Sequence, residues 1–232
     1  RTGIGMSYDD HGPNCACGIE RMGAFTKKNR LVAEMVPLIP GMHDRLSAGA
    51  DVADVGCGGG LAVIALAEAY PRSSFVGYDT SDEALARARA NLQETGLTNV
   101  RLCNPFQEPL PENPVFDLIT TFDVIHDTHY PQDLIDQIYG ALKDDGRWLC
   151  EDIKGFDSFE DNLKHHPIAA LLYGFPVTVC MNSGLSTADG AGLGTLGFTE
   201  PMAREMTAQA GFREFELLAI ENPMNNYYLL GK

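Results

Sequence analysis

The chain from residue 51 onward alternates between short apolar runs and longer amphipathic runs. The short runs are rich in Val, Ile, Leu and Phe, a pattern typical of buried strands. These predicted strands lie at 51–56, 73–79, 99–103, 115–125 and 147–153. Helical patterns fill most of the intervals, at 61–70, 80–95 and 131–145. Strands that alternate with helices pair in parallel through right-handed crossovers, so we expect a doubly wound α/β fold.

The C-terminal part adds two strands without a helix between them. A helix is predicted at 202–211, and β-like runs follow at 212–220 and 225–231. The link at 221–224 is too short to hold a crossover helix, so these two strands should be antiparallel. The predicted architecture is therefore a mostly parallel, seven-stranded, Rossmann-like sheet that ends in an antiparallel hairpin.

Two segments fall outside this alternation. Residues 1–45 are rich in Gly, Met and polar residues, with a helical pattern only around Leu31, Met35 and Leu38. Residues 154–198 form an excursion too long for an ordinary loop, and such excursions are often lids. We expect an N-terminal cap at 1–45 and an α/β domain at 46–232 that carries a substrate-cap insertion at 154–198.

The charge balance restricts the partners of this chain. Its 232 residues hold 17 Lys and Arg against 32 Asp and Glu, which gives a net charge of −15. Such a chain repels a phosphate backbone, so we expect no nucleic-acid partner. No stretch is long and apolar enough to span a bilayer, so we expect no membrane partner either.

The cysteines indicate a reducing compartment and no metal centre. Four of the six sit singly in apolar or Gly-rich segments, as thiols of cytoplasmic proteins do. Cys15 and Cys17 follow His11, but no second ligand pair comes at zinc-finger spacing. The sequence therefore predicts a cytoplasmic protein without a metal site.

The turn between the first predicted strand and helix is the most informative segment. A dinucleotide site requires G-x-G-x-x-G, but Leu61 stands where the last glycine would be. The segment instead reads D-x-G-x-G-x-G from Asp54 to Gly60, at the sheet edge where open α/β folds bind ligands. Asp79 ends the second strand, where a carboxylate can bind both hydroxyls of a ribose.

This pattern resembles the class I S-adenosylmethionine (SAM)-dependent methyltransferases from about residue 45 to the C-terminus. The matching segments are DVGCGGG, GYDTSDEALARARAN, FDLITTFDVIHD and LKDDGRWL. The run GLGTLGFTEPMAREMTAQAGF is similar to a bacterial subgroup that carries a winged-helix domain before the methyltransferase domain. No such domain precedes residue 45, so we expect the sequence to be a fragment or a processed form.

The resemblance implies a cofactor, SAM, with S-adenosylhomocysteine as its product, and a set of residues around it. Gly56, Gly58 and Gly60 would line the methionine and ribose side, and Asp79 would bind the ribose with Thr80 beside it. Asn104 stands where an acidic residue usually meets adenine, and Phe106 would pack on the purine. The further implied cofactor-binding residues are Asp54, Cys57, Pro105, Phe122 and Asp123.

His126 is the candidate general base. It follows the fourth predicted strand, and imidazole titrates near neutral pH and can take a proton from a hydroxyl. The His-Asp pair is similar to the His-Asp-Trp segment of small-molecule O-methyltransferases, whose histidine is the base. Glu151, at the end of the fifth strand, is the expected carboxylate that orients the imidazole. The alternative is a structural role, in which His126 bonds a backbone carbonyl.

The sequence thus predicts a SAM-dependent methyltransferase that acts on a small-molecule acceptor, with O-methylation favoured. A SAM-binding sensor without turnover is one alternative, and a methyltransferase that modifies proteins is another. The oligomeric state stays open, with a homodimer as one option.

Overall fold

The computed structural model describes residues 3–232, in which seven strands form one sheet of order β3-β2-β1-β4-β5-β7-β6. Five strands are parallel, and β7 runs antiparallel to both neighbours. The bounds are β1 (Asp51–Val55), β2 (Ser74–Tyr78), β3 (Val100–Cys103), β4 (Phe116–Phe122), β5 (Leu142–Ile153), β6 (Glu214–Leu217) and β7 (Asn225–Gly231). The predicted architecture, including the C-terminal hairpin, is confirmed.

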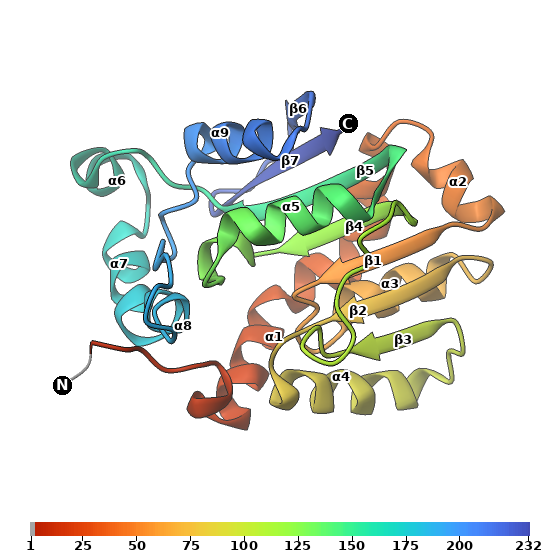
Figure 1. Cartoon of the computed structure of the whole chain (residues 1–232), viewed down its shortest axis with the longest axis horizontal. Helices are drawn as coiled ribbons and strands as arrows, with labels where there is room; N and C mark the ends of the chain where they lie inside the picture. The colour runs from red at the N-terminus through yellow and green to blue at the C-terminus, as the bar shows by residue number, and fades with distance from the viewer. Residues whose placement is uncertain (1–2) are drawn as a thin grey trace.

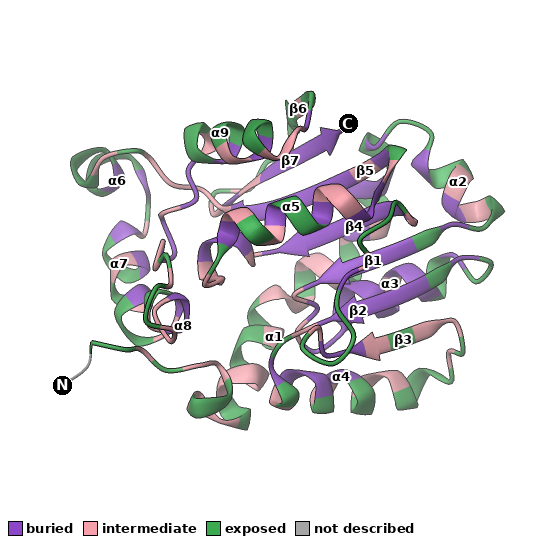
Figure 2. Cartoon of the chain, in the orientation of Figure 1, coloured by how far each residue is buried: buried purple, intermediate pink, exposed green. Residues whose placement is uncertain are grey.

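Both faces of the sheet are buried, because successive side chains of its central strands point into two separate cores. Val52 and Leu118 belong to the first core, whereas their neighbours Ala53 and Ile119 belong to the second. Figure 2 shows these strands as almost continuously buried. This explains why the strand segments are apolar runs rather than alternating ones.

Helices cover both faces, as Figure 1 shows. On one face α3 (Leu61–Ala69) packs into the first core, with α4 (Asp82–Thr95) beside it. On the other face α5 (Pro131–Ala141) and α9 (Glu200–Ala210) pack into the second core. The carboxyl ends of the parallel strands all meet one edge of the sheet, and loops from both layers converge there.

The N-terminal segment is more helical than its sequence predicts. It contains η1 (Asp9–His11), α1 (Pro13–Asn29), the π-helix η2 (Leu31–Met35), η3 (Val36–Leu38) and α2 (Met42–Ala48). The sequence analysis did not predict α1, a helix that buries none of its residues fully. The later part completes the first core with Leu31, Met35, Val36, Ile39, Met42 and Leu46. Leu38, by contrast, is exposed.

Two predicted boundaries are wrong. The helix expected to reach Gly146 ends at Ala141, and the next residues already belong to β5, with a register shift against β4. A Cβ at Gly146 would lie 2.9 Å from the carbonyl oxygen of Phe116, so the strand can follow this path only with glycine there. The helix expected to begin at residue 80 begins at Asp82, because Ser81 is its N-cap and accepts through Oγ from the Ala84 N–H at 3.1 Å.

The insertion at 154–198 contains three short helices: α6 (Phe159–His165), α7 (Ala169–Thr178) and α8 (Cys180–Gly184). In Figure 1 α7 and α8 lie beyond the carboxyl ends of the parallel strands, and the N-terminal segment passes beside them. Two segments far apart in sequence thus cover the same edge of the sheet. No helix in the described part of the chain has the length and apolar character needed to cross a membrane.

Candidate functional site

The turn after β1 is built from glycines in the left-handed backbone region. The φ angles are +73° at Gly56, +54° at Gly58 and +76° at Gly60. A Cβ at Gly56 would overlap the Val124 side chain, so this position also needs glycine for space. A Cβ at Gly58 would meet no atom within 4 Å. The turn therefore presents open backbone at Gly58, as close approach of a ligand requires.

Two carboxyl groups flank the turn. Asp79 accepts hydrogen bonds from the Gly58 N–H at 2.7 Å and from the Ser81 N–H at 2.9 Å. Asp54 lies below the turn, accepts from Thr120 Oγ1 at 2.8 Å, and keeps its buried Oδ2 without a partner. Burial raises the pKa of Asp54 to about 7 and raises the pKa of Asp79 as well. An unpaired buried oxygen beside open backbone suits a polar or cationic ligand.

The residues expected around adenine lie at the adjacent strand ends. Asn104 follows β3, and its Nδ2 donates to Asp82 Oδ1 at 3.0 Å. Its Oδ1 accepts from the Phe106 N–H at 3.0 Å, and the Phe106 ring is 79 % exposed. Thr80 is exposed and Pro105 is half-buried beside them. Cys57 is buried on the sheet side of the turn.

Helix α1 packs directly onto the glycine turn. Glu20 lies so close to Gly59 that a Cβ there would overlap its carboxylate. Arg87 of α4 holds Glu20 with both Nε, at 3.0 Å, and Nη2, at 2.7 Å. Asn91 of α4 donates to Glu20 at 3.0 Å and to the Gly59 carbonyl at 2.8 Å. The N-terminal segment is therefore part of the site and not an appendage.

A second group of carboxyls lies at the ends of β4 and β5, facing α1. Burial raises the pKa of Asp123 to about 6 and that of Glu151 to about 8. The Lys27 ammonium lowers both values, and also that of Asp54, while it stands 5.2 Å from the centre of the Phe122 ring. One cation from α1 thus stabilises the ionised form of three carboxyl groups.

Asp123 has an unusual backbone. Its φ of +59° is the only positive value at a non-glycine residue within 3–232. The strand stops there, and the Asp123 N–H donates to the Glu151 carbonyl at 2.9 Å. Its Oδ1 accepts from Asn225 Nδ2 at 2.6 Å. This turn sends the chain from β4 into the short 3₁₀ helix η4 (Ile125–Asp127).

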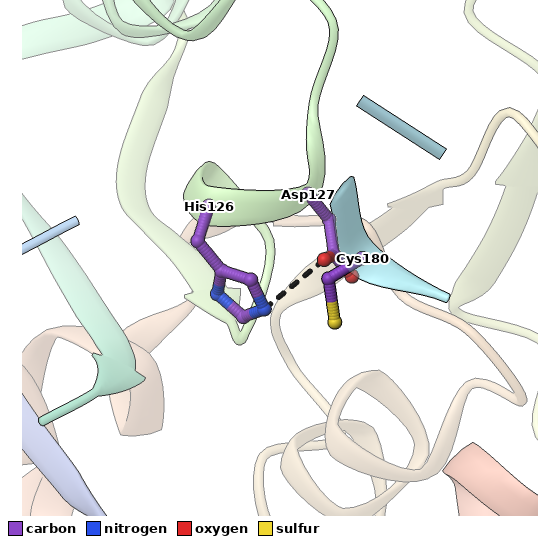
Figure 3. Close-up of side chains that lie close together, drawn as sticks. All are labelled: His126, Asp127 and Cys180. Carbon is purple, nitrogen blue, oxygen red and sulfur yellow. Dashed lines mark ion pairs between the residues drawn. The ribbon is translucent and has the colours of Figure 1, made fainter. Parts of the chain in front are cut away.

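His126 lies in η4 and is buried, with 2 % of its surface exposed. Its Nδ1 is 2.6 Å from Asp152 Oδ1, and its Nε2 is 3.0 Å from Asp127 Oδ1. Cys180 of α8 completes the group, as Figure 3 shows. Burial disfavours the imidazolium, but the carboxylates of Asp127 and Asp152 outweigh it and raise the pKa of His126 well above its ordinary value.

The expected pairing of His126 with Glu151 is wrong, because Asp152 takes that place. Adjacent residues of a strand point to opposite faces. Glu151 therefore faces the side of α1 and Lys27, whereas Asp152 points to the side of η4. Glu151 Oε2 is buried without a hydrogen-bond partner.

The sheet order separates the predicted residues into two groups. Asp79, Thr80 and the residues that follow β3 stand at one end of the carboxyl edge, and the His126 group stands after β4 and β5.

The sequence analysis did not predict four residues of the site, Glu20, Lys27, Asp152 and Cys180. Asp152 shares a strand face with Cys150, but both faces of 147–153 are apolar, so the sequence did not select Asp152 over Glu151. No sequence pattern pointed to the other three, because their places depend on long-range packing.

Replacing Lys27 with Met should destabilise the protein at alkaline pH and not at acidic pH. At pH 5 the carboxyls of Asp54, Asp123 and Glu151 are largely neutral, because their pKa values are about 7, 6 and 8. Their ionisation at higher pH costs stability, which Lys27 offsets. We expect the variant to lose about 1–2 kcal/mol of unfolding free energy at pH 9 and little at pH 5, measured with urea.

The control is Lys28→Met, one residue along α1, since Lys28 is exposed. It should leave stability unchanged at both pH values. An equal loss at pH 5 and pH 9 in the Lys27 variant would show that Lys27 acts through packing and not through charge.

Residues 53–148 match a protein family described as a methyltransferase domain. Among curated proteins, the chain is 30% identical over 142 residues to a ribosomal RNA small subunit methyltransferase G from Chlorobium limicola. The matched region covers 61% of this chain and 61% of that relative, so the chain spans less than two thirds of the relative's length.

Solved structures share the fold. A putative O-methyltransferase from Nostoc punctiforme superposes with a TM-score of 0.69 at 21% identity, over 95% of this chain and 60% of that chain. Human N-acetylserotonin methyltransferase in complex with SAM gives 0.63 at 19% identity, over 97% and 56%. Residues 53–148 thus match a methyltransferase domain family, and the chain shares the fold of these solved methyltransferases.

Proposed function

We infer that the protein transfers a methyl group from SAM to a hydroxyl group of a small-molecule acceptor. The observation that carries this proposal is a buried imidazole at the end of β4, oriented by a carboxylate, at the same sheet edge as the glycine turn. Methyl transfer to a hydroxyl needs the acceptor aligned with the donor, water excluded, and a proton removed. The described residues offer a group for each task.

The donor half of the site fits SAM. SAM supplies an electrophilic methyl group on a sulfonium, and it carries a positive charge. Open backbone at Gly58, the carboxylate of Asp79 and the unpaired Oδ2 of Asp54 are suited to hold a polar cation with a ribose. The residues around Asn104 lie at the next strand ends, where the adenine would extend. SAM is therefore the cofactor that these residues accommodate.

His126 is the group suited to remove the proton. Asp152 holds Nδ1 at 2.6 Å and fixes the ring, so Nε2 is the nitrogen left for an acceptor hydroxyl. Asp127 Oδ1 lies 3.0 Å from Nε2, so the Asp127 side chain must move away before an acceptor hydroxyl can reach this nitrogen. This arrangement supports a base and not a histidine that bonds a backbone carbonyl.

An apolar pocket in the substrate-cap insertion supports a small-molecule acceptor. It has a volume of about 620 Å³ and lies between the insertion and α9. Aromatic and aliphatic side chains form most of its wall, among them Phe156, Tyr173 and Leu193, and Asp157 adds a polar group. Its residue Thr195 donates to Cys180 beside the His126 group, at 3.0 Å. Pockets of this size accommodate molecules of cofactor or drug size.

The charge of the chain disfavours RNA as the acceptor, although one relative carries a ribosomal RNA methyltransferase name. A net charge of −15 opposes approach to a phosphate backbone. A protein acceptor would need an open groove, whereas the insertion and the N-terminal segment both cover the sheet edge. A SAM sensor without turnover would have no use for an oriented buried imidazole.

Replacing Gly58 with Ala should abolish tight SAM binding at a modest cost in stability. The new Cβ would stand where the cofactor approaches, and a φ of +54° costs about 1–2 kcal/mol for alanine. The matched control is Gly96→Ala at the C-cap of α4, where φ is +71° and a Cβ also meets nothing within 4 Å. Calorimetry should show equal stability losses and loss of SAM affinity only for Gly58→Ala.

Replacing His126 with Ala should lower the rate of methyl transfer about 100- to 10,000-fold and leave SAM affinity unchanged. The assay measures S-adenosylhomocysteine with a panel of phenols and alcohols, and separately with ribosomal RNA and a protein substrate. His165→Ala is the control, because His165 is exposed. Turnover with RNA alone would refute the proposal, and a fully active His126→Ala would remove the base.

A further inference from the structure

Three side chains with different donor atoms meet at the end of β4. A ring nitrogen of His126, a carboxylate oxygen of Asp127 and Cys180 Sγ all lie within 4.8 Å of one another. Figure 3 shows these three side chains close together. The first two come from η4 and the third from α8, 53 residues further along the chain. The three residues have no metal-ligand spacing in the sequence, so the sequence analysis, which considered only His11, Cys15 and Cys17, expected no metal site.

Each of the three residues is also held from behind. Asp152 holds His126 Nδ1 at 2.6 Å, and the Tyr8 hydroxyl donates a hydrogen bond to Asp127 Oδ2. Thr195 Oγ1 donates to Cys180 Sγ at 3.0 Å. Supporting hydrogen bonds of this kind orient the ligands of metal ions in proteins, and a carboxylate behind a histidine is the commonest form.

Asp127 Oδ1 is a buried oxygen for which the described residues supply no hydrogen-bond partner, and His126 Nε2 lies 3.0 Å from it. An unsatisfied buried oxygen of this kind is costly and calls for a partner that the protein itself does not supply. A cation shared by Oδ1, Nε2 and Sγ would satisfy this oxygen and the nitrogen together.

We propose that His126, Asp127 and Cys180 form a binding site for a transition-metal cation of the Zn²⁺ class. The donor set decides the class, since a thiolate and an imidazole favour Zn²⁺ or Co²⁺ over Mg²⁺ or Ca²⁺, which take oxygen ligands. Three protein ligands leave one position of a tetrahedral Zn²⁺ open to a small molecule.

The site has a consequence for the proposed function. A metal ion on Nε2 removes the lone pair with which His126 would accept a proton, so metal binding and base catalysis exclude each other. This consequence rests on the proposed methyl transfer, whereas the metal site itself does not. The experiment that tests the site therefore uses neither SAM nor an acceptor.

The test is titration of the metal-free, tag-free full chain with Co²⁺. A thiolate ligand gives Co²⁺ a charge-transfer band in the near ultraviolet, and we expect this band with one equivalent bound. Zn²⁺ should abolish the band by displacement, because it binds N, O and S sites more tightly than Co²⁺. Absence of the band in the wild-type chain would overturn the proposal.

Variants locate the ion. Cys180→Ser should lose the band, whereas Cys17→Ser, which changes a half-buried thiol of α1, should keep it. Asp152→Asn should weaken binding about 10- to 100-fold, since it removes only the support behind His126. A band that survives in Cys180→Ser would place the ion elsewhere and refute the site.

A second measurement needs no variant and decides the matter should Cys180→Ser fail to fold. In the wild-type chain, Zn²⁺ should slow alkylation of Cys180 and leave alkylation of Cys17 unchanged, as read by mass spectrometry of peptides. Equal rates at Cys180 with and without Zn²⁺ would overturn the proposal.

Discussion

The burial of carboxyl groups along one edge of the sheet is the constraint on which the rest of this structure depends. Asp54, Asp123 and Glu151 all leave water there, and the loss of hydration raises the pKa of each. Ionised carboxylates remain at such an edge only with cations or hydrogen-bond donors nearby. The protein meets the need with groups from distant parts of the chain.

Two groups meet that need from two sides of the sheet. Lys27 comes from the N-terminal segment, and the His126 imidazole, which lies between Asp127 and Asp152, comes from the end of β4. The edge therefore includes α1 as much as the strands. Glu20, clamped by Arg87 and Asn91 against Gly59, fixes α1 in register with the glycine turn. Charge balance and packing thus join the N-terminal segment to the sheet.

The fold was predictable because its signals are local. Apolar runs of strand length, the short 221–224 link and the turn from Asp54 to Gly60 each report on a few neighbouring residues. The helix α1 escaped prediction, and none of its residues is fully buried, because its contacts with the glycine turn are made by polar side chains such as Glu20. The end of α5 was misplaced because the shift of register at Gly146 depends on contact with Phe116, which lies on another strand.

The glycine turn was predictable from the sequence, and the surroundings of His126 were less so. The glycines lie in one short motif and Asp79 ends the next predicted strand, whereas the partners of His126 come from β5, α8 and the N-terminal segment. Glu151 and Asp152 are neighbours in sequence, and only the phase of the strand decides which of them meets the imidazole. That phase is set by the pairing of β5 with β4 and β7.

The left-handed turn at Asp123 limits which residues can occupy that position. Glycine, asparagine and aspartate tolerate a φ of +59°, while β-branched residues pay a steric penalty there. An acidic residue at the corresponding place in related chains would therefore be retained for backbone shape even where it touches no ligand. Retention of an aspartate at this position is therefore not evidence that it takes part in catalysis. If Asn or Gly can replace Asp123 without loss of activity, the backbone conformation is the reason for its retention.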